Sequence, residues 1–160
     1  MAAGVDEVLG RLFELALTLA EITERGLADR GLSRARAHMI TELYRRQKPL
    51  TQRELAAALG VSARNVTGLV DALEATGFVL RGPHPTDRRA TLVSLTEHGH
   101  TVAAALRADH HDFAVQLLAS VPDDDLTGFV TTLDQVLVHL RAAASLPPTQ
   151  DVDPAPIASR

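Results

Sequence analysis

Apolar residues recur at every third or fourth position over most of the chain, which is the spacing of amphipathic helices. Residues 5–20 form the first such stretch. We expect its helix to end at Gly26, because glycine tolerates the left-handed backbone that often follows a helix. A second helix is expected over residues 33–47, and Pro49 prevents its continuation. Its inward side is predicted to consist of Met39, Ile40, Leu43 and Tyr44.

Two short helical stretches come next. Thr51 and Glu54 stand three positions apart, so each can cap a backbone amide of the other at the start of the first stretch. This stretch ends at Gly60, and Ser62 is the N-cap expected for the second stretch, which ends at Gly77. Two short helices joined by a brief turn that contains glycine are typical of a helix-turn-helix.

Two stretches alternate like β-strands, residues 78–81 and residues 91–95, and both are rich in β-branched residues. Glycine and proline punctuate the segment between them, so the pair is predicted to form a hairpin, here named the wing. The tip of the wing carries Asp87, Arg88 and Arg89.

The last part of the chain returns to helical spacing. One helix is expected from Thr96 and another from Pro122, and the acidic residues 123–125 suit the positive end of the latter. Residues 145–160 are rich in proline and lack periodicity, so we expect them to be disordered.

These elements predict a mainly α fold with a small two- to three-stranded β wing: a winged helix-turn-helix joined to a helical dimerisation domain. The apolar stripes of the first helix and the last two helices exceed what one small winged helix can cover. Exposed apolar surface of that extent marks an interface, so we expect a homodimer. The expected parts are an N-terminal dimerisation helix (1–32), the winged helix-turn-helix (33–95), C-terminal dimerisation helices (96–144) and a disordered tail (145–160).

Composition and charge narrow the function. The 160 residues include no cysteine, which excludes disulfides and cysteine redox sensing. No apolar stretch approaches the ~20 residues of a membrane span, so a cytoplasmic protein with no membrane partner is expected. The net charge is −4, yet residues 33–95 hold ten Lys or Arg against five Asp or Glu, a net charge of +5, and the remainder carries −9. A basic middle part between acidic ends is typical of binding to a polyanion.

The second helix of the motif has a polar face suited to reading DNA, opposite its apolar stripe. A helix fits the major groove, where arginine pairs with guanine, asparagine pairs with adenine and a threonine methyl group packs on thymine. A glycine inside a helix costs about 1 kcal/mol relative to alanine, which makes sense where a groove wall leaves no room for a side chain. The predicted DNA-binding residues of the motif are Gln52, Ser62, Arg64, Asn65, Thr67 and Gly68, and Asp71 shares the polar face.

Arg88 and Arg89 at the tip of the wing are also predicted to bind DNA. A cationic tip on a twisted hairpin fits a minor groove, where negative potential is concentrated. Asp87 can accept hydrogen bonds from an arginine and hold it extended. The alternative is a surface ion pair that stabilises the turn, usually worth less than about 1 kcal/mol.

One stretch, residues 51–99, resembles the DNA-binding core of MarR-family transcription regulators; it reads TQRELAAALGVSARNVTGLVDALEATGFVLRGPHPTDRRATLVSLTEHG. The family's aspartate-x-arginine, followed by a strand ending in Leu-Thr, is present as Asp87, Arg89, Leu95 and Thr96. The resemblance implies a homodimer with interlocked terminal helices and two recognition helices on one pseudo-palindromic operator in double-stranded DNA. It also implies that Arg89 enters the minor groove, that Asp87 braces it, and that Arg88 binds phosphate or the same groove.

A repressor released by a small-molecule effector is the leading hypothesis. The effector is expected to be a small aromatic or anionic molecule. His38 is a candidate contact for it, and the alternative is a partly buried histidine with a backbone partner. No catalytic motif, metal site or cofactor is predicted, and the seven histidines are expected at the surface or at interfaces. Two other functions stay open: a winged-helix module that binds an acidic protein, and a sensor of small ligands without a direct DNA role.

Overall fold

The computed structural model describes residues 4–87 and 90–144. Arg88, Arg89 and the predicted disordered tail therefore lie outside the described residues. In chain order the elements are α1 (Val5–Ala28), α2 (Arg34–Arg46), β1 (Leu50–Thr51), α3 (Gln52–Leu59), α4 (Ala63–Ala75), β2 (Val79–Pro83), β3 (Thr91–Leu95), α5 (Glu97–Leu118) and α6 (Asp123–Ala144). This order confirms the predicted winged helix-turn-helix, with α3 and α4 as the motif and β2 and β3 as the wing.

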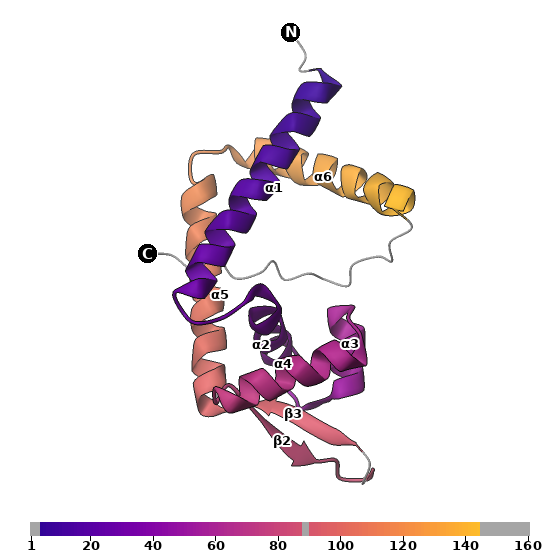
Figure 1. The fold of residues 1–160 in the computed structure, drawn as a ribbon. Helices are drawn as coiled ribbons and strands as arrows, with labels where there is room; N and C mark the ends of the chain where they lie inside the picture. The colour runs from indigo at the N-terminus through magenta and orange to yellow at the C-terminus, as the bar shows by residue number, and fades with distance from the viewer. Residues whose placement is uncertain (1–3, 88–89, 145–160) are drawn as a thin grey trace.

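A single apolar core holds the winged part together. The three strands form an antiparallel sheet in the order β1-β3-β2, with Leu50 opposite Val93 on one side and Arg81 opposite Val93 on the other. Helices α2, α3 and α4 pack against one another and against this sheet (Figure 1). The side chains that are fully buried between them include Met39, Ile40, Leu55, Leu73, Val66, Val70, Val79 and Val93.

The ends of the motif helices are set by the local sequence, as predicted. The Thr51 hydroxyl accepts a hydrogen bond from the backbone N–H of Glu54 at 3.2 Å, and the backbone N–H of Thr51 donates to the Glu54 carboxylate at 2.7 Å. Gly60 closes α3 with φ of +64°. The Ser62 hydroxyl then accepts from the backbone N–H of Asn65 at 3.3 Å and starts α4.

The end of α1 differs from the prediction. The helix does not stop at Gly26, which is buried inside it, but continues to Ala28. Gly31 is the residue with the left-handed backbone here, with φ of +67°. Leu27 is only 1% exposed and belongs to the core, so tertiary packing retains the last turn that the local glycine signal would have ended.

The start of α5 is fastened to the turn between α4 and β2. The Thr96 hydroxyl donates to the carbonyl of Gly77 at 2.7 Å, and the Thr96 backbone N–H donates to the carbonyl of Phe78 at 3.0 Å. One turn later, a Cβ added to Gly99 would lie 2.1 Å from that Phe78 carbonyl oxygen. Only glycine allows this close approach. We name the contact between residues 96–99 and residues 77–78 the α5 joint.

The outer helices leave large apolar side chains uncovered. Figure 1 shows α1, α6 and the distal end of α5 extending away from the winged part. No residue of α6 is buried, and Phe13 of α1 is 63% exposed. Within residues 4–87 and 90–144, no helix is apolar over a length that would cross a membrane. The exposed apolar side chains of these helices are Val5, Val8, Leu9, Phe13, Leu15, Leu17, Val115, Leu117, Leu118, Phe129, Val130, Val136, Leu137, Val138 and Leu140, which we name the apolar face.

Candidate nucleic-acid interface

Helix α4 turns a continuous polar face to solvent. Its apolar side is buried in the core through Val66, Val70 and Leu73. The five residues predicted to read DNA from this helix and its cap are all exposed, so the fold leaves them accessible to a partner. They are Ser62, Arg64, Asn65, Thr67 and Gly68.

A hydrogen bond joins the two helices of the motif at this face. The Thr67 hydroxyl donates to the side-chain oxygen of Gln52 at 3.0 Å, and it also lies 3.1 Å from the carbonyl of Ala63. Gln52 is the first residue of α3, directly after the capping Thr51. The structure therefore brings the predicted Gln52 to the exposed face of α4 and fixes it against Thr67.

Gly68 has no role in the packing of the chain. A Cβ added there would meet no atom within 4 Å among the described residues, and its backbone is that of an ordinary helix. Glycine is thus neither required by sterics nor favoured by helix propensity at this position. The missing side chain leaves space on the outward face.

Asp71 is exposed on α4, as expected for a residue of the polar face, and it is also engaged within the chain. Arg81 of β2 forms ion pairs with both Asp71 and Glu74, and its backbone N–H donates to Glu74 at 3.3 Å. Although partial burial opposes the charge, the hydrogen bonds to Asp71 and Glu74 hold the pKa of Arg81 above its usual value. This cluster ties the second half of α4 to the wing.

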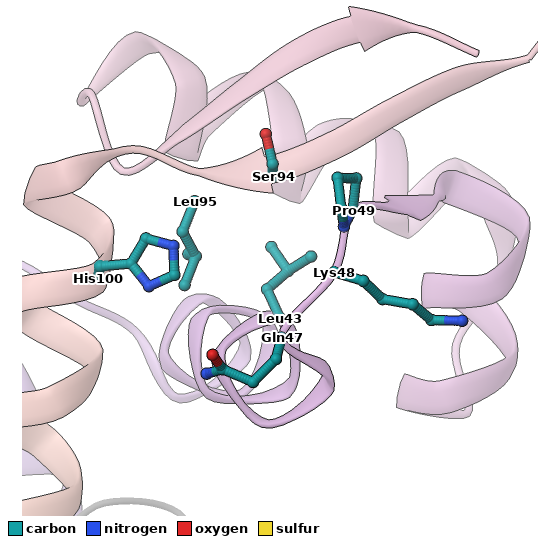
Figure 2. A pocket seen from close by; sticks show the side chains of 7 residues that line it. All are labelled: Leu43, Gln47, Lys48, Pro49, Ser94, Leu95 and His100. Atoms are coloured by element: carbon teal, nitrogen blue, oxygen red, sulfur yellow. The ribbon is translucent and has the colours of Figure 1, made fainter. Parts of the chain in front are cut away.

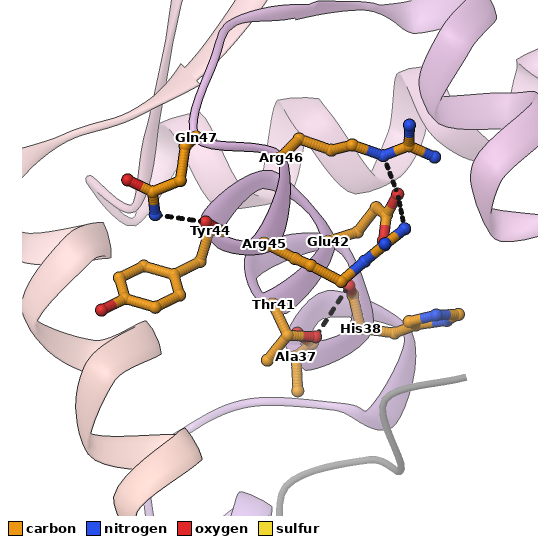
Figure 3. Close-up of polar contacts among 8 residues, drawn as sticks. All are labelled: Ala37, His38, Thr41, Glu42, Tyr44, Arg45, Arg46 and Gln47. Atoms are coloured by element: carbon orange, nitrogen blue, oxygen red, sulfur yellow. Dashed lines mark hydrogen bonds and ion pairs between the residues drawn. The ribbon is translucent and has the colours of Figure 1, made fainter. Parts of the chain in front are cut away.

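Two further arginines of the basic middle part are committed to α2. Glu42 is buried, and its carboxylate accepts from Arg45 at 3.0 Å and from Arg46 at 2.8 Å (Figure 3). Burial raises the pKa of Glu42, but the two guanidinium groups outweigh it and keep the pKa below the ordinary 4.5. Among the described residues of the basic middle part, 33–87 and 90–95, the cations without an ion pair in the chain are Arg36, Lys48, Arg53 and Arg64.

The wing is closed by its own backbone and by one side chain that the sequence did not single out. The His84 backbone N–H donates to the Ala90 carbonyl at 3.3 Å, and the Ala90 N–H donates to the Asp87 carbonyl at 3.1 Å. The Nδ1 atom of His84 accepts from the N–H groups of Thr86 and Asp87 at 3.3 and 3.1 Å. The bracing role of Asp87 stays a prediction, because the arginines it would brace lie outside the described residues.

The candidate effector residue, His38, lies outside one cavity of the described structure. His38 is half-buried on α2, and its carbonyl accepts from Thr41 at 3.0 Å. A cavity of about 250 Å³ lies instead between the end of α2, strand β3 and the start of α5 (Figure 2). Among the described residues, no three acidic, His or Cys side chains gather as metal ligands would. The cavity is lined by Leu43, Gln47, Lys48, Pro49, Ser94, Leu95 and His100.

Comparison with known proteins agrees with this geometry. Residues 30–90, which contain α2, the motif and the wing up to its tip, match the family model described as the MarR family. Residues 30–90 thus form a MarR-family winged helix-turn-helix. Over a longer stretch, the chain is 27% identical to the HTH-type transcriptional repressor YetL of Bacillus subtilis. The alignment spans 139 residues and covers 86% of this chain and 83% of YetL.

Solved structures share the fold of this chain over most of its length. FabT of Streptococcus pneumoniae, in complex with DNA, superposes with a TM-score of 0.71 at 20% identity, covering 87% of this chain and 96% of FabT. A MarR-family transcriptional regulator from Rhodococcus sp. RHA1 superposes with a TM-score of 0.61 at 25% identity, covering 84% of this chain and 96% of that one. The coverage extends beyond residues 30–90 and so includes outer helices.

Proposed function

We propose that this chain represses transcription as a homodimer on a pseudo-palindromic DNA operator and that a small-molecule effector releases it. The observation that carries the proposal is the exposed polar face of α4, with Arg64, Asn65 and Thr67 outward and Gln52 fixed beside them. These side chains match the hydrogen-bonding edges of the major groove. The relative YetL is named a repressor, and the FabT structure holds DNA, which supports the same role here.

The proposed dimer rests on the apolar face of α1, α5 and α6. Side chains such as Phe13 and Val130 are more than half exposed in the single chain, and burying such surface is the main favourable term in most protein association. A two-fold axis through this face pairs two α4 helices. On B-form DNA, we expect them in successive major grooves about 34 Å apart.

The proposed effector is a small aromatic or anionic molecule that binds one spacing of the two α4 helices better than the other. Only such differential affinity shifts DNA binding. His38 stays a candidate contact, and the cavity lined by Lys48 and His100 is a second place to examine, because it combines apolar walls with an ammonium group and an imidazole. A repressor must meet chromosomal DNA, so we place the protein in the cytoplasm.

Selection of bound duplexes from a random DNA pool, with the full chain, tests the proposal. We expect a palindrome whose half-sites lie one helical turn apart. With roughly 6–10 phosphate contacts per dimer, affinity should fall by about 10³–10⁵ between 50 and 200 mM salt. Enrichment of no sequence, together with binding that does not respond to salt, would contradict a DNA-reading role and favour the protein-binding or ligand-sensing alternatives.

Arg64→Ala tests which residues read the sequence. We expect the variant to bind the selected duplex about 5- to 100-fold less tightly and to tolerate changes at one base pair of each half-site, because a bidentate arginine contact is worth about 1–3 kcal/mol. Arg11→Ala is the matched control, since Arg11 is an exposed arginine of α1 that pairs only with Glu14 in the described residues. Fluorescence anisotropy with wild-type and single-substitution duplexes measures both effects.

A further inference from the structure

The segment between β2 and the tip of the wing turns around a single imidazole ring. His84 follows directly after β2, and its Nδ1 lies 3.3 Å from the backbone nitrogen of Thr86 and 3.1 Å from that of Asp87. The Thr86 hydroxyl lies 3.4 Å from the same atom. Two backbone donors and one hydroxyl group thus converge on one ring nitrogen, and residues 85–87 curl around the side chain of His84.

This arrangement fixes the chemical state of the ring. Neutral imidazole has one nitrogen that accepts and one that donates, whereas imidazolium donates at both. Because backbone N–H groups can only donate, Nδ1 must carry the lone pair, and the proton belongs on Nε2. Protonation of His84 would place a third N–H against those of Thr86 and Asp87. The turn is therefore compatible with the neutral Nε2–H form and not with the cation.

We propose that His84 is a positioning residue for DNA binding: its neutral imidazole organises residues 84–87, so that the wing is already shaped before it meets DNA. The inference rests on the proposed function. A loop that is already ordered in the free protein loses less conformational entropy when it binds DNA, so the binding is tighter. Acid should then weaken DNA binding through this one side chain, even though a new positive charge near phosphates would by itself strengthen it.

Two charged groups bear on the protonation of His84. Glu54 of α3 faces it closely enough for the two to interact electrostatically, although the Thr51 backbone N–H and hydroxyl are the main reasons why the pKa of Glu54 is lowered. Asp87 belongs to the turn itself. Both carboxylates favour the imidazolium, and the backbone donors of the turn favour the neutral ring.

Nuclear magnetic resonance on the full chain without DNA tests the geometry. Long-range proton–nitrogen spectra should show the Nε2–H tautomer for His84 at pH 8, and the amide of Asp87 should exchange slowly with solvent. His84→Asn keeps an acceptor atom at the same distance along the side chain, as asparagine does in turns, so it should preserve the slow exchange. His84→Ala removes the acceptor and should abolish it.

Fluorescence anisotropy with the duplex recovered from the random pool tests the role. At pH 8, His84→Ala should bind about tenfold less tightly per wing than wild type, which corresponds to the loss of one or two hydrogen bonds, while His84→Asn should bind like wild type. Between about pH 8 and pH 5, where histidines change charge, wild type should weaken toward the affinity of His84→Ala, and His84→Asn should weaken less. The other six histidines are common to wild type and both variants, so the difference isolates His84.

The outcomes separate the two claims. A wild-type chain that shows the Nε2–H tautomer but binds no duplex would overturn the proposed function and, with it, the role of His84 in DNA binding. A wild-type chain that binds the duplex while His84→Ala binds equally well, or while His84→Asn weakens in acid as steeply as wild type, would overturn the inference on His84 and leave the proposed function standing.

Discussion

Gly68→Ala should change stability and DNA binding in opposite directions. Alanine is favoured over glycine in a helix interior by about 1 kcal/mol, and the added methyl group would meet no atom within 4 Å in the described chain. The variant should therefore be more stable by roughly that amount, which raises the melting temperature by about 2–4 °C for a chain of this size.

DNA binding should weaken in the same variant, because Gly68 lies in the middle of the exposed polar face of α4, where helical spacing places it between Arg64 and Asn65. If α4 lies in the major groove with its backbone close to the groove wall, the methyl group must displace the helix. An overpacked contact costs about 1–3 kcal/mol, or roughly 5- to 150-fold in affinity for each half-site. Thermal melting followed by circular dichroism, and anisotropy with the selected duplex, measure the two quantities on one preparation.

Gly128→Ala is the matched control. Gly128 is also an exposed helical glycine with no atom within 4 Å of an added Cβ, and it shares the polar side of α6 with Asp124 and Thr131. It should give a similar gain in stability with no change in DNA affinity. A Gly68→Ala variant that melts higher and binds the duplex as tightly as wild type would refute the idea that the glycine reserves space for DNA.

Four further substitutions test other parts of the structure. Gly99→Ala forces a Cβ to within 2.1 Å of the Phe78 carbonyl oxygen and should lower the free energy of unfolding, measured with urea, by about 1–3 kcal/mol or more; an unchanged value would mean that the α5 joint is loose. Glu42→Gln should lower the free energy of unfolding by about 1–2 kcal/mol at pH 7, because the buried ion pairs with Arg45 and Arg46 are weakened. Because the folded pKa of Glu42 lies below 4.5, its contribution is present above that value and is lost as the pH falls through the folded pKa, so the wild-type and variant stabilities should converge in acid. Phe13→Asp, at a side chain 63% exposed in the single chain, should sediment as one subunit with its helical circular dichroism retained, and an intact dimer would argue against the apolar face as the interface. Arg89→Ala should weaken binding to the selected duplex and leave the dimer intact, and a dimer that dissociates would show that the wing has been misassigned.

Local signals in the sequence were enough to predict most of the winged part. The capping pair Thr51 and Glu54 and the N-cap Ser62 act within one turn of helix, so their effect is visible without the rest of the chain. The outward residues of α4 follow from the same helical spacing that places Val66 and Val70 inward. For these positions local preference and tertiary packing agree.

The features that were missed depend on residues distant in sequence or on a side chain curling onto its own loop. Gly99 is needed because the Phe78 carbonyl approaches it, and no pattern around position 99 reveals that neighbour. Gly26 gave the opposite error: the sequence predicts a helix end there, but the packing of Leu27 in the core extends α1 past it. The sequence holds only a weak signal for His84, which is a polar side chain directly before a proline-containing turn. Among seven histidines, this one did not stand out.

The α5 joint also determines how motion passes between the two ends of the molecule. Helix α5 has 22 residues, so it is about 33 Å long and acts as a stiff arm whose base is anchored to the turn between the end of α4 and the beginning of the wing. A tilt of about 5° at that base moves the far tip by about 3 Å. The reverse also holds: a displacement at the far end of α5 would tilt α4 and the wing through the same contact, because Gly99 packs too closely on Phe78 to leave room for a side chain.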